Sequence, residues 1–227
     1  MDDAVQGAGS FSERIASLLK RVEYRLARTE HALDDIYRLR YDANLRENAI
    51  SPNTSGKLVD RFDAVSNVFN FGIFIDDVLT SALRLHCLTS DEPYSPAFDA
   101  FPDLLADRVN AGVRIIDGNR FVANYPRARS FPELPYITLR IGILAAIRFK
   151  CDLITASVRS EHYPFYKREY FASKLCEPRP YPTLIKPLSL ISINFKDDGE
   201  AIEKRHPFYQ SSADERARLF DPVPEPA

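Results

Sequence analysis

The chain has 227 residues, of which 45 % are hydrophobic, so it can bury a sizeable core and most simply forms one domain. Its 30 lysine and arginine residues are balanced by 32 aspartate and glutamate residues, which argues against nucleic-acid binding. The three cysteines are far apart and the four histidines lack i, i+4 spacing, so the sequence predicts reduced thiols and no metal site.

The two ends of the chain differ from its middle. Residues 1–11 are small and acidic, without the basic and apolar regions of a secretory signal, and we predict a disordered leader. The Pro- and acid-containing residues 211–227 predict a flexible tail, which leaves 12–210 as the domain. No apolar run is long enough to span a membrane, so we expect a cytoplasmic protein with no stable membrane insertion.

Extended segments and a helix alternate in the first half of the chain. Thr29 is placed to cap a helix with apolar residues at helical spacing. The predicted elements are a strand over 22–27, a helix over 29–47, and an antiparallel hairpin with strands over 68–75 and 78–88. In the second hairpin strand, Arg84 falls on a face distinct from that of Leu83 and Leu85.

In the second half, an apolar β-branched run leads into Asp117 and Arg120. Ser130 and Glu133 match the capping-box pattern and predict the start of a helix that ends near residue 150. The remaining predicted elements are a helix over 101–109, strands over 113–124, 153–158 and 185–195, and short helices around 162–170 and 198–206. This order predicts an α/β architecture with a mixed sheet.

Burying a charged side chain in a strand costs free energy, so such residues are expected to be paired or functional. Asp117 and Arg120 therefore either lie at a solvated end of their strand or belong to a site.

Four motifs, in this order, resemble one branch of the GNAT-type acyltransferases. Residues 60–63 (DRFD), the hairpin and Arg84-Leu85 resemble the D-x-x-D … R-L signature of acyl-homoserine lactone synthases. Residues 117–122 (DGNRFV) resemble their E-x-S-R-F strand, with aspartate where that family usually has glutamate. Residues 38–41 (RLRY) and 162–166 (HYPFY) are closer to the N-acyl amino acid synthases. The resemblance covers about residues 22–195 and implies a GNAT fold, with a mixed twisted sheet and helices on both faces.

The junction before the long helix lacks the glycine-rich loop with which acetyl-CoA-using members bind a diphosphate. The resemblance instead implies acyl carrier protein as the donor, with no bound cofactor. Arg127 and Arg129 would hold the single phosphate of its phosphopantetheine arm. The long helix also carries Arg140, Arg148 and Lys150. These residues either form a docking face for the acidic carrier or are ordinary solvated charges.

The resemblance also assigns catalytic roles. Asp117 matches the family glutamate and is the candidate base that removes the amine proton, unless it only orients an arginine. The other candidate catalytic residues are Arg40, Arg84 and Arg120. With Asp60 and Asp63 they would form an ion-pair network that shapes the acceptor pocket, or else make plain surface salt bridges. The predicted substrate-binding residues are Asp60, Asp63, Phe121, Val122 and Asn124.

Aromatic residues have two interpretations. Phe69, Phe71, Phe74, Phe121 and Phe149 either line an acyl-chain pocket or pack in the core. Tyr166 lies where many GNAT enzymes place the acid for the leaving thiol, and the alternative for Tyr166 and His162 is simple packing.

The sequence therefore predicts an N-acyltransferase that moves a long fatty acyl chain from acyl carrier protein to the amine of an amino acid or related small molecule. One alternative is an acyl-homoserine lactone synthase, against which Asp117 and the absence of tryptophan count. The other is a catalytically silent module that binds an acyl chain or acyl carrier protein. An open tunnel between splayed strands with Asp117 at its mouth would favour an enzyme, and a plugged one would favour the binding module.

Overall fold

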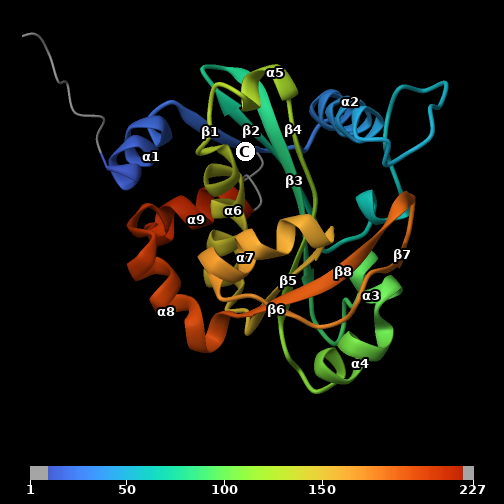
Figure 1. The fold of residues 1–227 in the computed structure, drawn as a ribbon. Helices are drawn as coiled ribbons and strands as arrows, with labels where there is room; N and C mark the ends of the chain where they lie inside the picture. Colours follow the sequence, from blue (N-terminus) through green and yellow to red (C-terminus); the bar gives the residue numbers. More distant parts are fainter. Residues whose placement is uncertain (1–9, 222–227) are drawn as a thin grey trace, which may run out of the picture.

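The protein, seen here in a computed structural model that describes residues 10–221, is built around one twisted sheet (Figure 1). Its strands are β1 (Val22–Leu26), β2 (Val68–Ile75), β3 (Val78–Leu88), β4 (Ile115–Ala123), β5 (Leu153–Val158), β6 (Ser173–Lys174), β7 (Arg179–Tyr181) and β8 (Leu184–Asn194). They are ordered β1-β2-β3-β4-β5-β8-β6, and β7 pairs with β8. Among the strands of residues 10–221, only β4 and β5 pair in parallel, so the predicted mixed sheet is confirmed.

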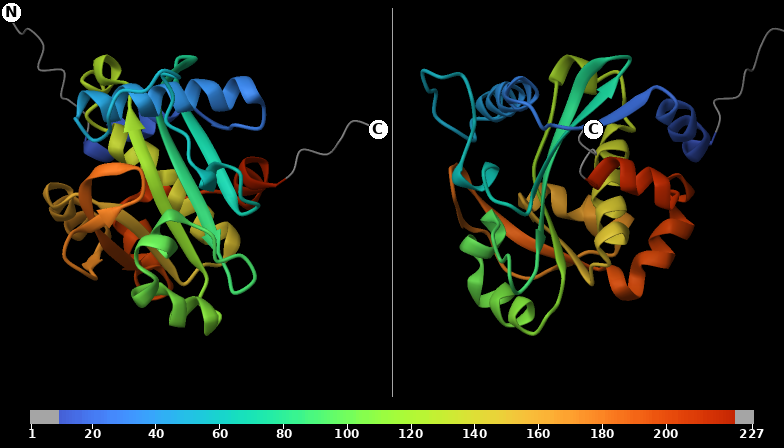
Figure 2. Two further views of the ribbon diagram at one scale, coloured as in Figure 1. Left: turned by 90° about the vertical axis from the view of Figure 1, so that its right-hand side faces the viewer. Right: turned by 180° about the vertical axis from the view of Figure 1, so that it is seen from behind.

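Helices cover both faces of this sheet, as the sequence predicted (Figure 2). They are α1 (Phe11–Leu19), α2 (Glu30–Arg46), α3 (Pro96–Ala100), α4 (Pro102–Asn110), α5 (Tyr125–Ala128), α6 (Leu134–Phe149), α7 (Tyr163–Tyr170), α8 (Phe195–Arg205) and α9 (Ala213–Phe220). One face packs against α1, α6, α7, α8 and α9, and the other against α2, α3 and α4. Among residues 10–221, no helix has both the length and the apolar character needed to cross a bilayer.

The larger core lies between the sheet and α6. Leu85, Ile116 and Leu144 are almost fully buried there, and α6 is apolar on most sides because the sheet and the C-terminal helices enclose it. Arg84 and His86 alternate with Leu85 along β3 and belong to the opposite face, as predicted for Arg84. One face of β3 is therefore apolar and the other carries buried polar groups.

The two central parallel strands separate after a short paired stretch. Pairing joins 115–118 of β4 to 153–156 of β5 and ends there. The register of β4 with β3 shifts between Ala82 and Arg84, opposite Arg120, whose φ of 53° is rare for a residue with a side chain. This bulge accompanies the separation of β4 from β5, which leaves room for a cavity between them.

The start of α6 differs from the predicted capping box at Ser130 and Glu133. Glu133 is itself the N-cap residue, and no side chain caps the helix. Its carboxylate lies 2.9 Å from Nε of Arg14 on α1. The prediction is wrong because α5 and the turn after it occupy the residues before Glu133, so α6 begins later.

The predicted tail is wrong for residues 213–220, which form α9. Ser212 caps this helix, and Phe220 at its end is buried against Phe69, Phe71 and Phe149, with ring centroids 5.4–5.7 Å away. The composition of the segment concealed this apolar anchor. Residues 1–9 of the predicted leader and 222–227 of the tail lie outside the described residues.

We expect Phe220→Ala to lower the free energy of unfolding by about 3–5 kcal/mol, because a buried aromatic side chain is removed and a cavity is left. Urea denaturation followed by circular dichroism measures this loss. Arg218→Ala, at an exposed position of the same helix, is the matched control and should change stability by less than about 0.5 kcal/mol. Equal effects of the two changes would show that α9 does not anchor the core.

Candidate active site

Two carboxylates are fixed by a short 3-10 helix, η1 (Arg61–Asp63), between α2 and β2. The Asp60 side chain accepts a hydrogen bond from the backbone N–H of Phe62, and the Asp63 side chain accepts one from the N–H of Asp60, both at 3.0 Å. This reciprocal capping holds both carboxylates in place before any arginine reaches them.

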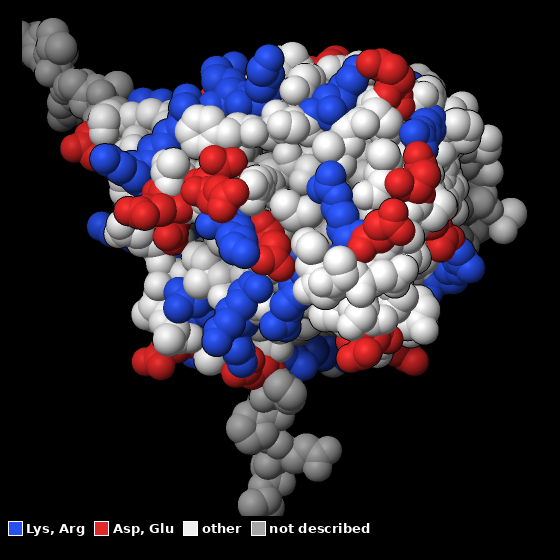
Figure 3. Space-filling view, turned by 90° about the horizontal axis from the view of Figure 1, so that it is seen from below, with Lys and Arg blue, Asp and Glu red and all other residues white. Residues whose placement is uncertain are grey.

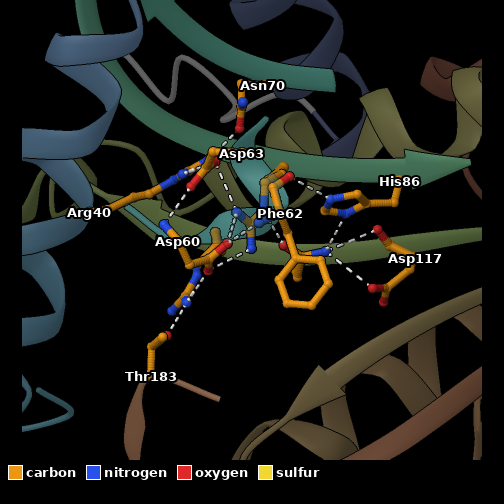
Figure 4. A network of polar contacts seen from close by, with 11 residues as sticks. Arg40, Asp60, Phe62, Asp63, Asn70, His86, Asp117 and Thr183 are labelled. Carbon is orange, nitrogen blue, oxygen red and sulfur yellow. Dashed lines mark hydrogen bonds and ion pairs between the residues drawn. The ribbon is translucent and has the colours of Figure 1, made fainter. Parts of the chain in front are cut away.

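Three arginines from three elements converge on these carboxylates. Figure 4 labels Arg40 among them, together with Asp60 and Asp63. Arg40 of α2 reaches Asp63 at 2.7 Å. Arg84 of β3 forms a bidentate pair with Asp60 at 2.7 and 3.0 Å and lies 2.9 Å from Asp63. Arg120 of β4 donates to Asp60 at 2.6 Å. All five side chains are at most 7 % exposed, so the interpretation as surface salt bridges is wrong.

The network keeps its acids ionised. Burial by itself would raise the pKa of Asp60, but Arg84 and Arg120 hold that pKa well below its usual range. The pKa of Asp63 is likewise lowered, against its burial, by Arg40 and Arg84. Ion pairs that are this deeply buried are costly to break, because the remaining partner becomes an uncompensated charge.

Asp60→Asn should therefore destabilise the protein by about 3–5 kcal/mol at pH 7. Because the pKa of Asp60 is lowered on folding, its contribution is present above the unfolded-state pKa of about 4 and is lost as the pH falls below it. Urea unfolding at pH 7 and pH 3.5 tests both points, and the gap between wild type and variant should narrow at the lower pH.

Asp77→Asn is the matched control, since the Asp77 side chain is 87 % exposed in its pair with Arg25. It should cost at most about 1 kcal/mol. A control as destabilising as Asp60→Asn would mean that burial does not set the strength of the network.

Asp117 lies next to this network and is completely buried. Its carboxylate accepts hydrogen bonds from Nδ2 of Asn119 at 3.2 Å and from Oγ1 of Thr155 at 3.4 Å. Burial raises the pKa of Asp117 to about 6. A carboxyl group with this pKa is able to take up a proton near neutral pH.

Asn119 connects Asp117 to the arginines, a link that the sequence analysis missed. Its Oδ1 accepts from Nε of Arg84 at 2.7 Å, and its Nδ2 lies 3.1 Å from Nδ1 of His86. Burial lowers the pKa of His86 to about 3, so the ring is neutral and its Nε2 donates to the Phe62 carbonyl at 3.0 Å. Two features of the sequence could have indicated these residues. Asn119 is the third residue of the motif that resembles E-x-S-R-F, and His86 follows Arg84 by two residues and so lies on the same face of its strand.

A cavity of about 530 Å³ lies between the splayed strands β4 and β5. One part of its wall is apolar, formed by residues such as Leu85, Gly142, Ile143, Ile154 and Ile191. The other part is polar and includes Arg46, Glu47, Arg159, His162 and Lys186. The cavity is therefore suited to a ligand with an apolar chain and a polar end.

The predicted site residues divide between this cavity and its surroundings. Arg120, Phe121 and Val122 line it. The carboxylates Asp60, Asp63 and Asp117 and the arginines Arg40 and Arg84 lie behind its wall. Asn124 does not line it and instead caps α5, accepting from the N–H of Arg127. The tunnel between the strands is thus open, and Asp117 does not lie at its mouth.

Most of the phenylalanines proposed for the acyl pocket pack elsewhere. Phe121 lines the cavity, whereas Phe69, Phe71 and Phe149 surround Phe220 on the opposite side of α6, and Phe74 lies under the guanidinium of Arg25 at 4.1 Å. The part of the cavity wall that β5, β8 and α6 form contains no aromatic residue, and the aromatic residues of the lining come mostly from α5, α7 and β7.

Three aromatic residues of the HYPFY segment line the cavity, namely His162, Phe165 and Tyr166. Tyr166 is half-buried, and the loss of solvent around its hydroxyl raises the pKa of Tyr166 to about 12, so that hydroxyl stays protonated. His162 has its pKa lowered by burial, and its Nε2 lies 2.8 Å from Nη2 of Arg159.

Some of the basic residues that were assigned to the acyl donor already interact with other groups of the protein. Arg127 donates to the Ile75 carbonyl at 2.9 Å, while Arg129 lies over the ring of Tyr125, which lines the cavity. Arg140 is buried and pairs with Glu215 at 2.7 Å, so it neither forms a docking face nor is solvated. The face seen from below shows basic side chains beside acidic ones rather than in a separate patch (Figure 3).

Comparison with known structures identifies the fold. The chain is similar to FeeM, an N-acyl amino acid synthase from uncultured soil microbes, with a TM-score of 0.67 and 14 % identity over 83 % of this chain and 98 % of that one. It is similar to BjaI, a CoA-dependent acyl-homoserine lactone synthase (TM-score 0.59, 16 % identity, 88 % and 98 % covered). An acyl-CoA N-acyltransferase from Pseudomonas aeruginosa also matches, with a TM-score of 0.52 and 16 % identity over 76 % of this chain and 99 % of that one. The predicted GNAT fold is confirmed.

The family follows from the sequence. Residues 35–194 match the family described as N-acyl amino acid synthase FeeM, and the chain belongs to this family of acyltransferases. No curated protein matches the chain.

Proposed function

We propose that this protein transfers a long-chain fatty acyl group from acyl carrier protein to the amine of an amino acid or related small molecule. The observation that carries the proposal is the open cavity between β4 and β5, apolar along one part and charged along the other. An acyl chain fits the aliphatic part, and an amine substrate fits the polar part. A silent binding module would be expected to have a plugged passage between these strands, whereas this cavity is open.

The donor is the second part of the proposal. The junction after β4 contains no glycine. It forms the short helix α5, with Asn124 as its N-cap residue and Pro126 in its first turn, so it lacks a loop suited to a diphosphate. Tyr125 and Ala128 of α5 line the cavity, and Arg129 lies beside them, with its guanidinium over the Tyr125 ring. Arg129 therefore supports the proposal, because it offers a cationic group beside the cavity that suits the phosphate of a phosphopantetheine arm.

The chemistry requires a neutral amine to attack the thioester carbon. A C–N bond forms, the C–S bond breaks, the amine loses a proton and the leaving thiolate gains one. Thr155 borders the cavity and donates to Asp117, so the amine proton passes to Thr155 Oγ1 as its own proton moves to the carboxylate. Tyr166, whose hydroxyl is protonated, is the candidate donor to the thiolate.

We expect Asp117→Asn to lower kcat by about 10²–10⁴-fold, the usual contribution of a positioned acid or base. In the wild-type enzyme, kcat/KM should fall as the pH drops below about 6, because the base must be ionised and its pKa is raised to about 6. Steady-state rates from pH 5 to 8 with a purified acyl-acyl carrier protein measure both effects.

Thr155→Ser, which keeps the hydroxyl, should retain most activity, whereas Thr155→Val should not. Unchanged turnover of Asp117→Asn, with folding intact by circular dichroism, would remove Asp117 as the base.

The reaction itself is tested by mass spectrometry of lipid extracts from cells that overproduce the protein, with the Asp117→Asn variant as control. We expect a series of N-acyl amino acids that is absent from the control. Acyl-homoserine lactones would instead identify a lactone synthase, and no new lipid with acyl carrier protein still co-purifying would identify a silent binder. Rates with purified acyl-acyl carrier protein and acyl-CoA then decide the donor, and we expect the carrier protein to be preferred.

A further inference from the structure

Two glycines that line the cavity occupy positions at which a glycine weakens the fold. Gly118 lies within β4, and Gly142 lies in the middle of α6, where it is buried. Glycine inside a strand or a helix is destabilising relative to alanine, because it loses more backbone freedom on folding. A glycine at such a position therefore needs a physical reason.

The other glycines of residues 10–221 have local reasons. Gly56 and Gly112 have positive φ, at 63° and 86°, a conformation that disfavours residues with a side chain. A Cβ atom on Gly72 would lie 2.8 Å from a phenylalanine ring, and one on Gly199 would lie 3.3 Å from another. Backbone conformation or packing thus accounts for each of these four.

Neither reason applies to Gly118 or Gly142, whose φ angles are not positive. Outside its own helix, a Cβ atom on Gly142 would come within 4 Å only of Cδ2 of Leu85, at 3.9 Å. One on Gly118 would lie 3.7 Å from the Thr155 carbonyl oxygen and 3.8 Å from the same Leu85 atom. These are ordinary van der Waals distances, so an alanine would fit at both positions. What the two glycines provide is space in the cavity.

That space borders an apolar row of residues across the sheet. From β3 to β8 the row consists of Leu85, Gly118, Ala156 and Ile191, each paired with the next. Directly paired residues point to the same face of a sheet, and this face is the one that α6 covers. All four line the cavity, as does Gly142 above them on α6. Gly118 and Ala156 form the last pair before β4 and β5 separate, so the row lies where the space between these strands opens.

We infer that the acyl chain passes over Leu85 between β4 and α6, and that Gly118 and Gly142 set the longest chain that the enzyme accepts. The inference rests on the proposed acyl transfer and makes its donor specificity more precise. Methylene groups suit this part of the wall, because its aliphatic side chains offer no hydrogen bond to a polar substrate. A side chain at either glycine would occupy the space of part of the acyl chain.

The test measures how bulk at residue 142 changes the choice of acyl chain. Purified full-length wild type and Gly142→Leu are given hexanoyl- or hexadecanoyl-acyl carrier protein, with an equimolar mixture of the twenty amino acids as acceptors. We expect the ratio of kcat/KM for the hexadecanoyl donor to that for the hexanoyl donor to fall at least about 100-fold in the variant. The reason is that a misfit of even one methylene in an apolar pocket changes preference by about 10–200-fold. An unchanged ratio, with folding intact by circular dichroism, would overturn the inference and leave the proposed transfer standing.

Gly142→Ala separates the requirement of a ligand from that of the fold. We expect its Tm to rise by about 2–4 °C, since alanine favours a helix and its methyl group has room, while the same ratio falls. A lower Tm would show that the fold itself requires this glycine and would overturn the inference. Gly199→Ala, inside α8 and outside the cavity lining, is the control and should leave the ratio unchanged.

A binding measurement tests the acyl-chain site independently of turnover. If the wild type transfers no acyl chain, the proposed function is overturned, and the affinity for cis-parinaric acid, a fluorescent long-chain fatty acid, then decides the inference. We expect Gly142→Leu to raise the Kd for this probe at least about 10-fold. Equal Kd values for wild type and variant would overturn the inference.

Discussion

The buried pairing of Asp60 with Arg84 and Arg120 is the interaction on which the rest of the site depends. It joins a loop before β2 to the centres of β3 and β4, across elements that are far apart in the sequence. Its cost is high, since two guanidinium groups and a carboxylate leave water together. That cost is offset by the bidentate geometry and by the backbone N–H groups of η1, which fix the carboxylates independently.

From this network the site extends in two directions. Through Asn119 it reaches Asp117, whose buried carboxyl group has a pKa of about 6 and lies behind the cavity wall. Through Arg120 it reaches the cavity directly, at the bulge where β4 separates from β5. One set of ion pairs thus supports a buried carboxyl group suited to proton transfer and an arginine on the cavity wall, and the bulge that re-aims Arg120 accompanies the separation of the strands.

The resemblance of the motifs succeeded because it rested on residues whose chemistry is unusual in a core. Asp60, Asp63, Arg84 and Arg120 were expected to meet, and they do. Predictions from local pattern alone were weaker. The pattern at Ser130 and Glu133 is a valid capping box that the chain does not use, whereas the same pattern at Ser10 and Glu13 does cap α1.

The sequence by itself determined the order of the longer strands and helices and the identity of the ion-pairing residues, because periodicity and charged residues within apolar runs are local properties of the chain. Only the tertiary structure decided what each residue faces. It placed Asp117 behind the cavity wall, buried Arg140 against the C-terminal segment and assigned Phe220 to the core. It also brought Tyr181, from a short strand that the sequence did not predict, to the wall that Arg120 and Ser157 share. Such placements depend on strand separation and on long-range packing, which no short stretch of sequence encodes.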